Sequence, residues 1–351
     1  MTCIPKSKFH HPQLPVNDLG LTYRDYEGSM STLCAGCGHD SVGAAVVQAC
    51  FELSLPAHRI AKLSGIGCSS KAPTYFLGKS HGFNSVHGRM PSVATGANLA
   101  NRELVYLGMS GDGDSASIGL GQFAHVVRRQ LNMSYIVANN GAYGLTKGQP
   151  SATADMGSVM KGGKEITDEG IDLVSLALSM GATYVARSFS GDKDQLVPLI
   201  KGALSHQGFA FIDVMSPCVT FNNHQGSTKS YDYLRDHMES LISADFIPHK
   251  SEITVKTEPG VSRDIFMHDG SLMRLKATDD SYDPTNRNSA KAAIQKHIDN
   301  GEVLTGLLYL ESGSSHLHDN LNTVCEPLSE LKYKDLCPGS EALETLNNSF
   351  R

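Results

Sequence analysis

No apolar run in the 351-residue sequence approaches the roughly 18 to 20 residues that a membrane-spanning helix needs. The first fifteen residues also lack the apolar core of a secretory signal. An excess of basic side chains is missing as well, because 30 Lys and Arg stand against 36 Asp and Glu, for a net charge of −6. This balance argues against nucleic acid and anionic membrane surfaces as partners. Together these absences predict a cytoplasmic enzyme.

Internal repeats and low-complexity linkers are absent too, and the composition is that of an ordinary globular protein. Many of the 34 glycines cluster beside Asp, Cys and Asn, which suggests loops that approach a ligand closely. After about residue 245 the chain becomes more polar and less regular. We therefore expect an N-terminal arm (1–30), one main domain (31–245) and a C-terminal extension (246–351) that packs on the domain or on a partner.

Helical and strand patterns alternate between about residues 33 and 218, and the strand patterns are continuous apolar runs. This alternation is typical of an α/β fold, a doubly wound and mostly parallel sheet covered by helices on both faces. The predicted strands are 60–64, 104–109, 134–138, 182–187 and 209–214. The predicted helices are 40–53, 92–102, 115–130, 172–180 and 192–205. The stretch 141–171 has no periodicity, and a loop of this length is usually functional.

Chemically distinctive residues follow four of the predicted strands. In chain order they are Cys68, Asp112, the pair Asn139 and Asn140, and Cys218. The carboxyl ends of parallel strands share one edge of a sheet, where ligands bind. We therefore expect residues more than a hundred positions apart to meet at one site.

The motif Gly111-Asp112-Gly113, followed by 25 residues and then Asn139-Asn140, has the donor types that Mg²⁺ prefers. A carboxylate, an amide oxygen and a backbone carbonyl can hold the ion, while a helix N-terminus faces a diphosphate. A glycine turn followed by an asparagine turn is the alternative reading of the same residues. The full spacing, within a β–α–β context, favours the metal site.

This spacing resembles the signature of thiamine-diphosphate enzymes. The resemblance implies that Asp112 and Asn140 are side-chain Mg²⁺ ligands and that Ala142 is a backbone ligand. Residues of the same segments are implied to contact the cofactor. They are Gly36, His39, Gly67, Cys68, Ser69, Gly111, Asp112, Gly113, Asp114, Asn140, Ala142, Gly144, Leu145 and Thr146.

Eight cysteines are present, and one pair is close in sequence, Cys34 and Cys37. With Cys68 and Cys218 this pair offers four thiolates at the same edge of the sheet. Zinc is the main rival of an iron–sulfur cluster, but structural zinc sites usually contain two close pairs. An isolated cysteine is as often simply buried and inert.

Three segments, LCAGCGHDSV, GIGCSSK and DVMSPCVTFNNH, resemble the cluster-binding segments of 2-oxoacid:ferredoxin oxidoreductase β subunits, and the similarity runs over about residues 30–245. It implies that Cys34, Cys37, Cys68 and Cys218 bind one [4Fe–4S] cluster. The chain lacks the cysteine run of two-cluster ferredoxin modules. The remaining cysteines are expected to be structural. They are Cys3, Cys50, Cys325 and Cys337.

The loop GLTKGQ, which contains Leu145 and Lys147, resembles the version found in 2-oxoglutarate enzymes. Lys71 falls where the family places a group near the far end of the substrate, and its ammonium suits a γ-carboxylate. His87 and Arg89 resemble residues near the thiazolium end, and together these five residues form the predicted catalytic set. A solvated lysine and core or cap histidines are the alternative readings of Lys71, His87 and His39.

The family implies oxidative decarboxylation of 2-oxoglutarate with coenzyme A to succinyl-CoA and CO₂, with electrons passed to ferredoxin, or the reverse reaction. It also implies an α partner, because this chain carries only the diphosphate half of a thiamine site. The alternatives are a pyruvate or branched-chain 2-oxoacid enzyme, a non-redox thiamine lyase, and a cluster-carrying scaffold without catalysis.

Overall fold

The computed structural model describes residues 11–247, 262–267, 271–277, 282–337 and 339–351, and Cys3 lies outside these ranges. Within them, ten strands form one central sheet in the order β10-β11-β9-β12-β7-β8-β4-β3-β1-β2. A small ribbon of β5 and β6 lies apart from it. The strands are β1 (Ile60–Ser64), β2 (His81–Asn84), β3 (Val105–Gly111), β4 (Met133–Asn139), β5 (Ala142–Tyr143), β6 (Gln149–Pro150), β7 (Tyr184–Phe189), β8 (Phe209–Met215), β9 (Met238–Ile247), β10 (Ser262–Phe266), β11 (Leu272–Ala277) and β12 (Val303–Leu310).

The half of the sheet from β2 to β7 is parallel, as the apolar runs predict. Each of the five predicted strands is present, with ends displaced by no more than a few residues. Gly111 of β3 lies opposite Ala138 of β4, and Asn139 lies opposite Met215 of β8. This register brings the residues that follow the three strands to one edge, so the predicted convergence of the motifs is confirmed.

The other half of the sheet is mixed. β12 runs antiparallel to β7 and parallel to β9, while β11 and β10 add an antiparallel hairpin. The boundary expected at residue 245 therefore falls inside β9, and residues 303–310 complete the same sheet. β12 is an apolar strand that is buried along almost its whole length. A position inside the sheet, beside β7, lets helices cover both of its faces.

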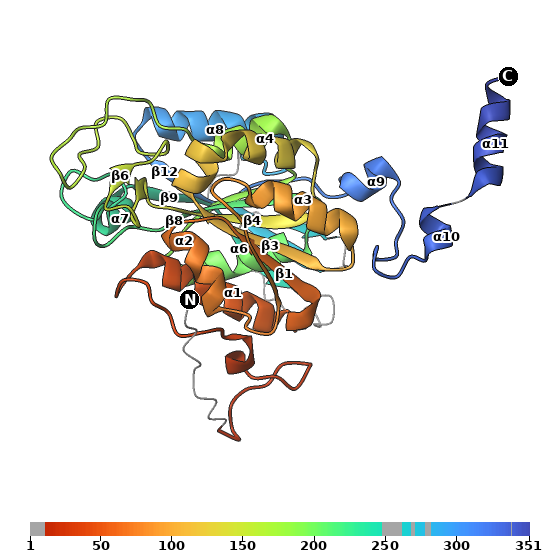
Figure 1. The fold of residues 1–351 in the computed structure, drawn as a ribbon. Coiled ribbons are helices and arrows are strands. Elements are labelled where there is room, and N and C mark those ends of the chain that lie inside the picture. The colour runs from red at the N-terminus through yellow and green to blue at the C-terminus, as the bar shows by residue number, and fades with distance from the viewer. Residues whose placement is uncertain (1–10, 248–261, 268–270, 278–281, 338) are drawn as a thin grey trace.

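Helices cover both faces of the sheet (Figure 1). α1 and α6 pack together on one face, and α3, α4, α5 and α8 follow one another across the opposite face. Aspartate side chains cap two of them, Asp172 at α5 and Asp192 at α6. The helices are α1 (Gly38–Glu52), α2 (Cys68–Lys71), α3 (Met90–Ala100), α4 (Leu120–Arg128), α5 (Leu173–Met180), α6 (Lys193–Ser205), α7 (Tyr231–His237), α8 (Arg287–Asp299), α9 (Leu317–Leu321), α10 (Tyr333–Leu336) and α11 (Ser340–Ser349).

The helix expected over 115–130 is interrupted. A π-helical segment, Gly113–Ile118, begins directly after Asp112 and gives way to α4 at Leu120. π-Helical turns of this kind are frequent at functional sites, because they displace side chains from the regular helical path. The apolar face of α4 still packs on the sheet, where Phe123 makes edge-to-face contacts with Tyr135 and Phe211.

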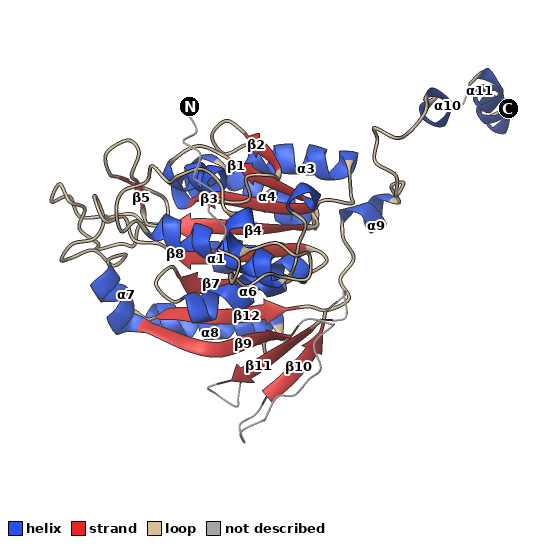
Figure 2. Ribbon diagram, turned by 90° about the horizontal axis from the view of Figure 1, so that it is seen from below, coloured by secondary structure: helices blue, strands red, loops and turns tan. Residues whose placement is uncertain are grey.

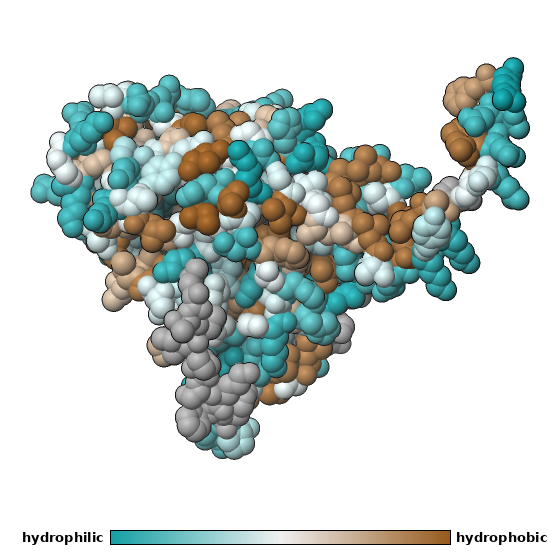
Figure 3. All heavy atoms as spheres, viewed as in Figure 1, coloured by the Kyte–Doolittle hydropathy of each residue, from teal (hydrophilic) through white to brown (hydrophobic). Residues whose placement is uncertain are grey.

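The C-terminal residues form an arm that leaves the body of the protein (Figures 1 and 2). Neither α10 nor α11 buries a single residue, and Phe350 and Tyr333 are 84% and 81% exposed. Figure 3 shows apolar side chains facing solvent along this arm. Helices this short are marginal in water on their own. In the described part of the chain, no helix has both the length and the apolar character for a bilayer crossing.

Candidate active site

A pocket opens at the carboxyl ends of β1, β3 and β4. Fourteen of the residues singled out from the sequence line it, together with Ile66 and Tyr143, which the motifs did not point to. The fourteen are His39, Gly67, Cys68, Ser69, His87, Gly111, Asp112, Gly113, Asp114, Asn140, Ala142, Gly144, Leu145 and Thr146. This position agrees with the rule that open α/β sheets bind ligands beyond their carboxyl strand ends.

Asp112 lies deep in the pocket and is 1% exposed. Its Oδ2 accepts hydrogen bonds from Thr153 Oγ1 at 2.8 Å and from Ser151 Oγ, and its Oδ1 accepts one from Asn140 N at 3.3 Å. Burial raises the pKa of Asp112, and the hydroxyl hydrogen bonds oppose that rise. Within the described ranges no lysine or arginine acts on this carboxylate. A buried carboxylate without a basic partner fits a cation site.

The second strand end supplies the other oxygens. Asn140 Oδ1 accepts from Ala142 N at 3.0 Å, so the side chain is held against its own turn. Ala142 in β5 faces Pro150 in β6, and proline has no N–H to donate across the ribbon. The Ala142 carbonyl is therefore free of that pairing and available to a cation. The three predicted Mg²⁺ ligands share one pocket wall, and they fit the donor set that Mg²⁺ requires.

Ser151 and Thr153 contact Asp112, and the sequence did not reveal them as residues of the site. They follow β6 inside the aperiodic stretch 141–171, and Thr153 Oγ1 also lies 3.0 Å from Asn139 Oδ1. Asn139 in turn donates to Asp213 Oδ1 at 3.1 Å. The only signal in the sequence was the unusual length of the loop, since nothing local ties its hydroxyls to a motif about 40 residues earlier.

His39 is buried beneath the pocket at 2% exposure. Its Nδ1 lies 2.7 Å from Ser216 Oγ, and its Nε2 lies 3.5 Å from Asn140 Nδ2. Burial lowers the pKa of His39 to about 4, so the ring is neutral at pH 7. The structure thus places this histidine against a predicted Mg²⁺ ligand.

The four cysteines predicted to bind a cluster gather beside the pocket. Cys37 precedes α1, Cys68 begins α2, and Cys218 follows β8. Burial raises the pKa of the Cys37 thiol to about 11, with smaller contributions from the charges of Cys218 and Cys68. Burial also raises the pKa of Cys68, and the neighbouring Cys218 and Cys34 act in the same direction. Each thiol therefore lies within electrostatic reach of others in the group.

Their spacing bears on which metal group they suit. Tetrahedral zinc with Zn–S bonds of about 2.3 Å needs sulfurs about 3.8 Å apart. Among the described residues, only Glu239, His297 and Glu302 bring three ligand atoms within 4.8 Å of one another, so no three of these thiols are that close. The thiols therefore do not form the close set that tetrahedral zinc needs, and four thiolates are the donor set of a [4Fe–4S] cluster.

The remaining predicted residues lie around the rim. Lys71 ends α2 and lowers the pKa of Cys68 by its charge, although burial dominates. Arg89 precedes α3 and is exposed, and Leu145 and Lys147 are exposed in the loop after β5. Gly36 lies between Cys34 and Cys37, with a left-handed backbone (φ 77°) that favours glycine. The pocket brings Leu145 to its wall, but Lys71, Arg89, Lys147 and Gly36 lie outside its lining.

The long loop is fastened to the segment that carries Cys218. Lys229 Nζ lies 3.0 Å from Asp155 Oδ2, and Thr228 donates to the same carboxylate at 2.5 Å. Lys161 Nζ donates to the Thr220 carbonyl at 2.8 Å. The loop that supplies Ser151 and Thr153 to Asp112 is thus connected directly to the thiol side of the site.

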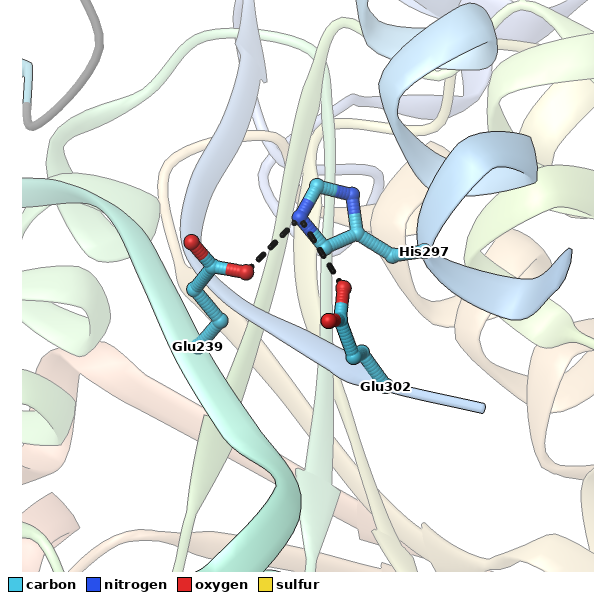
Figure 4. Close-up of side chains that lie close together, drawn as sticks. All are labelled: Glu239, His297 and Glu302. Carbon is cyan, nitrogen blue, oxygen red and sulfur yellow. Dashed lines mark hydrogen bonds and ion pairs between the residues drawn. The ribbon is translucent and has the colours of Figure 1, made fainter. Parts of the chain in front are cut away.

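Other candidate ligands lie elsewhere. Cys50 is fully buried in the core, in line with a structural role, whereas Cys325 and Cys337 are exposed. His297 lies 3.1 Å from Glu239 and 3.8 Å from Glu302 (Figure 4). Its Nδ1 lies 2.7 Å from the Ala293 carbonyl, so both ring nitrogens have partners. These contacts fasten α8 to β9 and to the start of β12, outside the pocket.

Comparison with known proteins identifies the class to which this fold and pocket belong. Residues 65–214 match the family described as thiamine pyrophosphate enzyme, C-terminal TPP binding domain. The chain is 41% identical over 199 residues to the 2-oxoacid:ferredoxin oxidoreductase subunit beta of Saccharolobus solfataricus, covering 56% of this chain and 65% of that subunit. It is 38% identical over 224 residues to the 2-oxoglutarate synthase subunit KorB of Methanocaldococcus jannaschii, covering 62% of this chain and 81% of that subunit.

A solved structure extends the likeness along the chain. It is 2-oxoglutarate:ferredoxin oxidoreductase from Magnetococcus marinus with 2-oxoglutarate, coenzyme A and succinyl-CoA bound. The two chains share 30% identity with a TM-score of 0.72, over 93% of this chain and 96% of the other. The protein is therefore a thiamine pyrophosphate-binding α/β protein. Within that class, the chain belongs to the family of 2-oxoacid:ferredoxin oxidoreductase β subunits, which confirms the resemblance stated from its motifs.

Proposed function

We propose that this chain binds thiamine diphosphate through Mg²⁺ and one [4Fe–4S] cluster, and acts with an α subunit. The assembled enzyme oxidatively decarboxylates 2-oxoglutarate with coenzyme A to succinyl-CoA and CO₂, and passes the electrons to ferredoxin. The reverse reaction uses the same residues. Asp112, Asn140 and the Ala142 carbonyl would hold the cation, and Cys34, Cys37, Cys68 and Cys218 would hold the cluster.

The position of Gly144 is the observation that carries the proposal. Gly144 lines the pocket that contains Asp112. A methyl group added at Gly144 would lie 3.4 Å from Cys218 Sγ and 3.6 Å from Cys68 Sγ. Two of the thiols therefore lie directly beside the pocket wall at Gly144, and Cys68 itself lines the pocket. A non-redox thiamine lyase has no need for such thiols, and a scaffold has no need for Asp112.

The residues of this chain have distinct tasks in that reaction. When bound, thiamine diphosphate supplies an electron sink for decarboxylation, and the cluster accepts electrons one at a time. Asp112 and Asn140 would hold the diphosphate end through the cation, in the same pocket that Gly144 lines. The neutral His39 supports Asn140 without adding a charge beside the cation.

Three features support 2-oxoglutarate as the substrate. The KorB relative is named as a 2-oxoglutarate synthase subunit, and the Magnetococcus enzyme is a 2-oxoglutarate:ferredoxin oxidoreductase with 2-oxoglutarate bound. Lys71 lies close enough to Cys68 to act on its pKa, and Lys147 stands in the exposed loop after β5. Either ammonium can pair with a γ-carboxylate, which pyruvate lacks. Pyruvate or a branched-chain 2-oxoacid is the alternative.

The C-terminal arm supports an obligatory partner. Its helices expose Leu343, Leu346 and Phe350, side chains that a stable isolated chain would bury. The Saccharolobus relative is named as a β subunit, which points to an α subunit as the partner. The cytoplasmic location predicted from the sequence accords with an enzyme of this kind.

Viologen reduction by the complex tests the proposal. The chain is isolated anaerobically with its partner, and reduction is followed with coenzyme A and either 2-oxoglutarate or pyruvate. We expect reduction that strongly favours 2-oxoglutarate. Preference for pyruvate would refute the substrate but keep the class. A complex that contains thiamine and iron yet reduces viologen with no 2-oxoacid would refute the redox function.

A further inference from the structure

The buried carboxylate of Asp114 pairs with the partly exposed imidazole of His87 at the pocket wall. His87 Nδ1 lies 2.9 Å from Asp114 Oδ1, and the same oxygen accepts the Gly88 N–H at 2.9 Å. Ser110 Oγ donates to Asp114 Oδ2 at 2.7 Å. The Asp114 side chain is 3% exposed, whereas that of His87 is 48% exposed. The sequence motifs assign both residues to the site but indicate no relation between them.

The surrounding backbone fits closely around this carboxylate. A methyl group at Gly65 would lie 1.8 Å from Asp114 Oδ2, so a side chain there would displace the carboxylate. Gly88 and Gly119 approach so closely that a methyl group on Gly88 would lie 2.7 Å from the Gly119 backbone. Two segments that are distant from Asp114 in sequence, at Gly65 and at His87–Gly88, therefore border its carboxylate. These contacts hold the carboxylate against His87.

The hydrogen bonds decide which nitrogen of His87 carries the proton. A backbone N–H can only donate, so Asp114 Oδ1 is an acceptor toward Gly88. An ionised carboxylate has no proton to donate, so Asp114 Oδ1 also accepts from His87, and Nδ1 is the donor. Nε2 is the remaining ring nitrogen, on a side chain that lines the pocket. A carboxylate behind an imidazole fixes its tautomer and orientation in the same way in hydrolases.

We propose that Asp114 is a positioning residue that holds His87 as its Nδ1–H tautomer, so that Nε2 presents a proton-accepting nitrogen to the bound substrate or cofactor. This inference rests on the proposed function, since it assigns the task of one residue in the same pocket. It predicts that Asp114 acts on turnover only through His87. If Asp114 had only a structural role, its replacement would instead affect folding or cofactor binding, and this effect would not depend on the residue at position 87.

The tautomer can be measured without any turnover. The complex is labelled with ¹⁵N-histidine, and two-bond ¹⁵N–¹H correlations are recorded at about pH 8, where ordinary imidazoles are neutral. The His87→Gln variant identifies the signals of His87. We expect a protonated Nδ1 and an unprotonated Nε2. A protonated Nε2 with a bare Nδ1 would overturn the inference.

A double-mutant cycle on kcat tests the coupling. Asp114→Asn keeps the size of the side chain and an acceptor oxygen but loses the charge, so we expect about a 10-fold loss of kcat. His87→Asn removes the proton acceptor, so we expect about a 100-fold loss. The double variant should be no slower than His87→Asn alone, with KM changed by less than about twofold. Losses that multiply would overturn the inference, as would an unchanged kcat in Asp114→Asn.

The controls separate this inference from the proposed function. His81→Asn alters an exposed histidine of β2, outside the pocket lining, and should leave kcat unchanged. Magnesium-dependent thiamine diphosphate binding should be equal in the wild type and in both single variants. If the wild-type complex turns over no 2-oxoacid, the proposed function fails, and the ¹⁵N measurement still decides the tautomer.

Discussion

Replacing Thr153 by valine removes one hydroxyl donor from Asp112 while keeping the volume of the side chain. In the structure Thr153 Oγ1 lies 2.8 Å from Asp112 Oδ2 and 3.0 Å from Asn139 Oδ1. The hydroxyl therefore orients the predicted Mg²⁺ ligand, and Thr153 itself lies outside the pocket lining. We expect the Thr153→Val variant to fold and to assemble, but to bind thiamine diphosphate and Mg²⁺ more weakly.

The magnitude follows from the type of bond that is lost. A hydrogen bond to a charged group contributes about 1.5 to 3 kcal/mol. Ser151 still donates to the same oxygen, so the lower part of that range applies. About 1.5 kcal/mol corresponds to roughly a 10-fold weaker affinity, at the lower end of the roughly 10- to 100-fold losses seen when partners of metal ligands are removed.

The assay is a calorimetric titration of thiamine diphosphate into the complex, once saturated with Mg²⁺ and once free of metal. Thr95→Val is the matched control, because its half-buried hydroxyl donates to the Pro91 carbonyl in α3, outside the pocket. It should bind the cofactor as the wild type does. An unchanged affinity in Thr153→Val would refute the role assigned to the loop, and so would a loss that is equal without Mg²⁺.

Three further changes test other parts of the site. Lys229→Met should lower the free energy of unfolding by about 1 to 2 kcal/mol at pH 7, less than a fully buried pair because Asp155 is 44% exposed. Burial raises the pKa of Asp155, but the charge of Lys229 and the hydrogen bonds to this carboxylate together outweigh burial and lower it. The stabilisation is therefore present above about pH 4 and is lost as the pH falls further. Urea unfolding at several pH values measures this dependence. Lys71→Met should raise KM for 2-oxoglutarate about 10- to 100-fold and leave pyruvate turnover unchanged, in steady-state viologen assays. Cys218→Ala should abolish the iron–sulfur absorbance of the complex while thiamine diphosphate still binds.

Each change has a counterpart that should do little. Lys79→Met alters an exposed lysine that, unlike Lys71, does not act on the pKa of Cys68, and it should keep the KM for 2-oxoglutarate. Cys325→Ala removes an exposed thiol and should keep the iron. A stability gap between wild type and Lys229→Met that persists unchanged below about pH 4 would contradict the assignment to Asp155. Full iron content in Cys218→Ala would contradict the set of cluster ligands.

The parallel half of the fold was predictable because its strands are buried on both faces. The apolar runs of β1, β4 and β8 are buried along their length, so their positions can be read from the sequence, and the site motifs follow directly from them. Asp112, Asn140 and Cys218 could therefore be assigned to one edge from the sequence alone.

What escaped prediction depends on contacts between distant segments. Nothing near Ser151 or Thr153 in sequence indicates a bond to Asp112, because the loop returns to β3 only in the folded chain. The π-helical turn after Asp112 keeps the apolar spacing of the following helix and so leaves no local signal. β12 joins β7 although the two strands are far apart in the sequence, which explains why the extension was not recognised as part of the sheet.

The central claim is that the thiamine pocket and the thiols form one route for electrons. Its most direct test is the absorbance and EPR spectrum of the anaerobic complex after 2-oxoglutarate is added without coenzyme A or an external acceptor. We predict partial reduction of the cluster within a single turnover, and none in Asp112→Asn, which should not retain the cofactor. A cluster that stays oxidised in a wild-type complex containing thiamine diphosphate, Mg²⁺ and iron would contradict the claim.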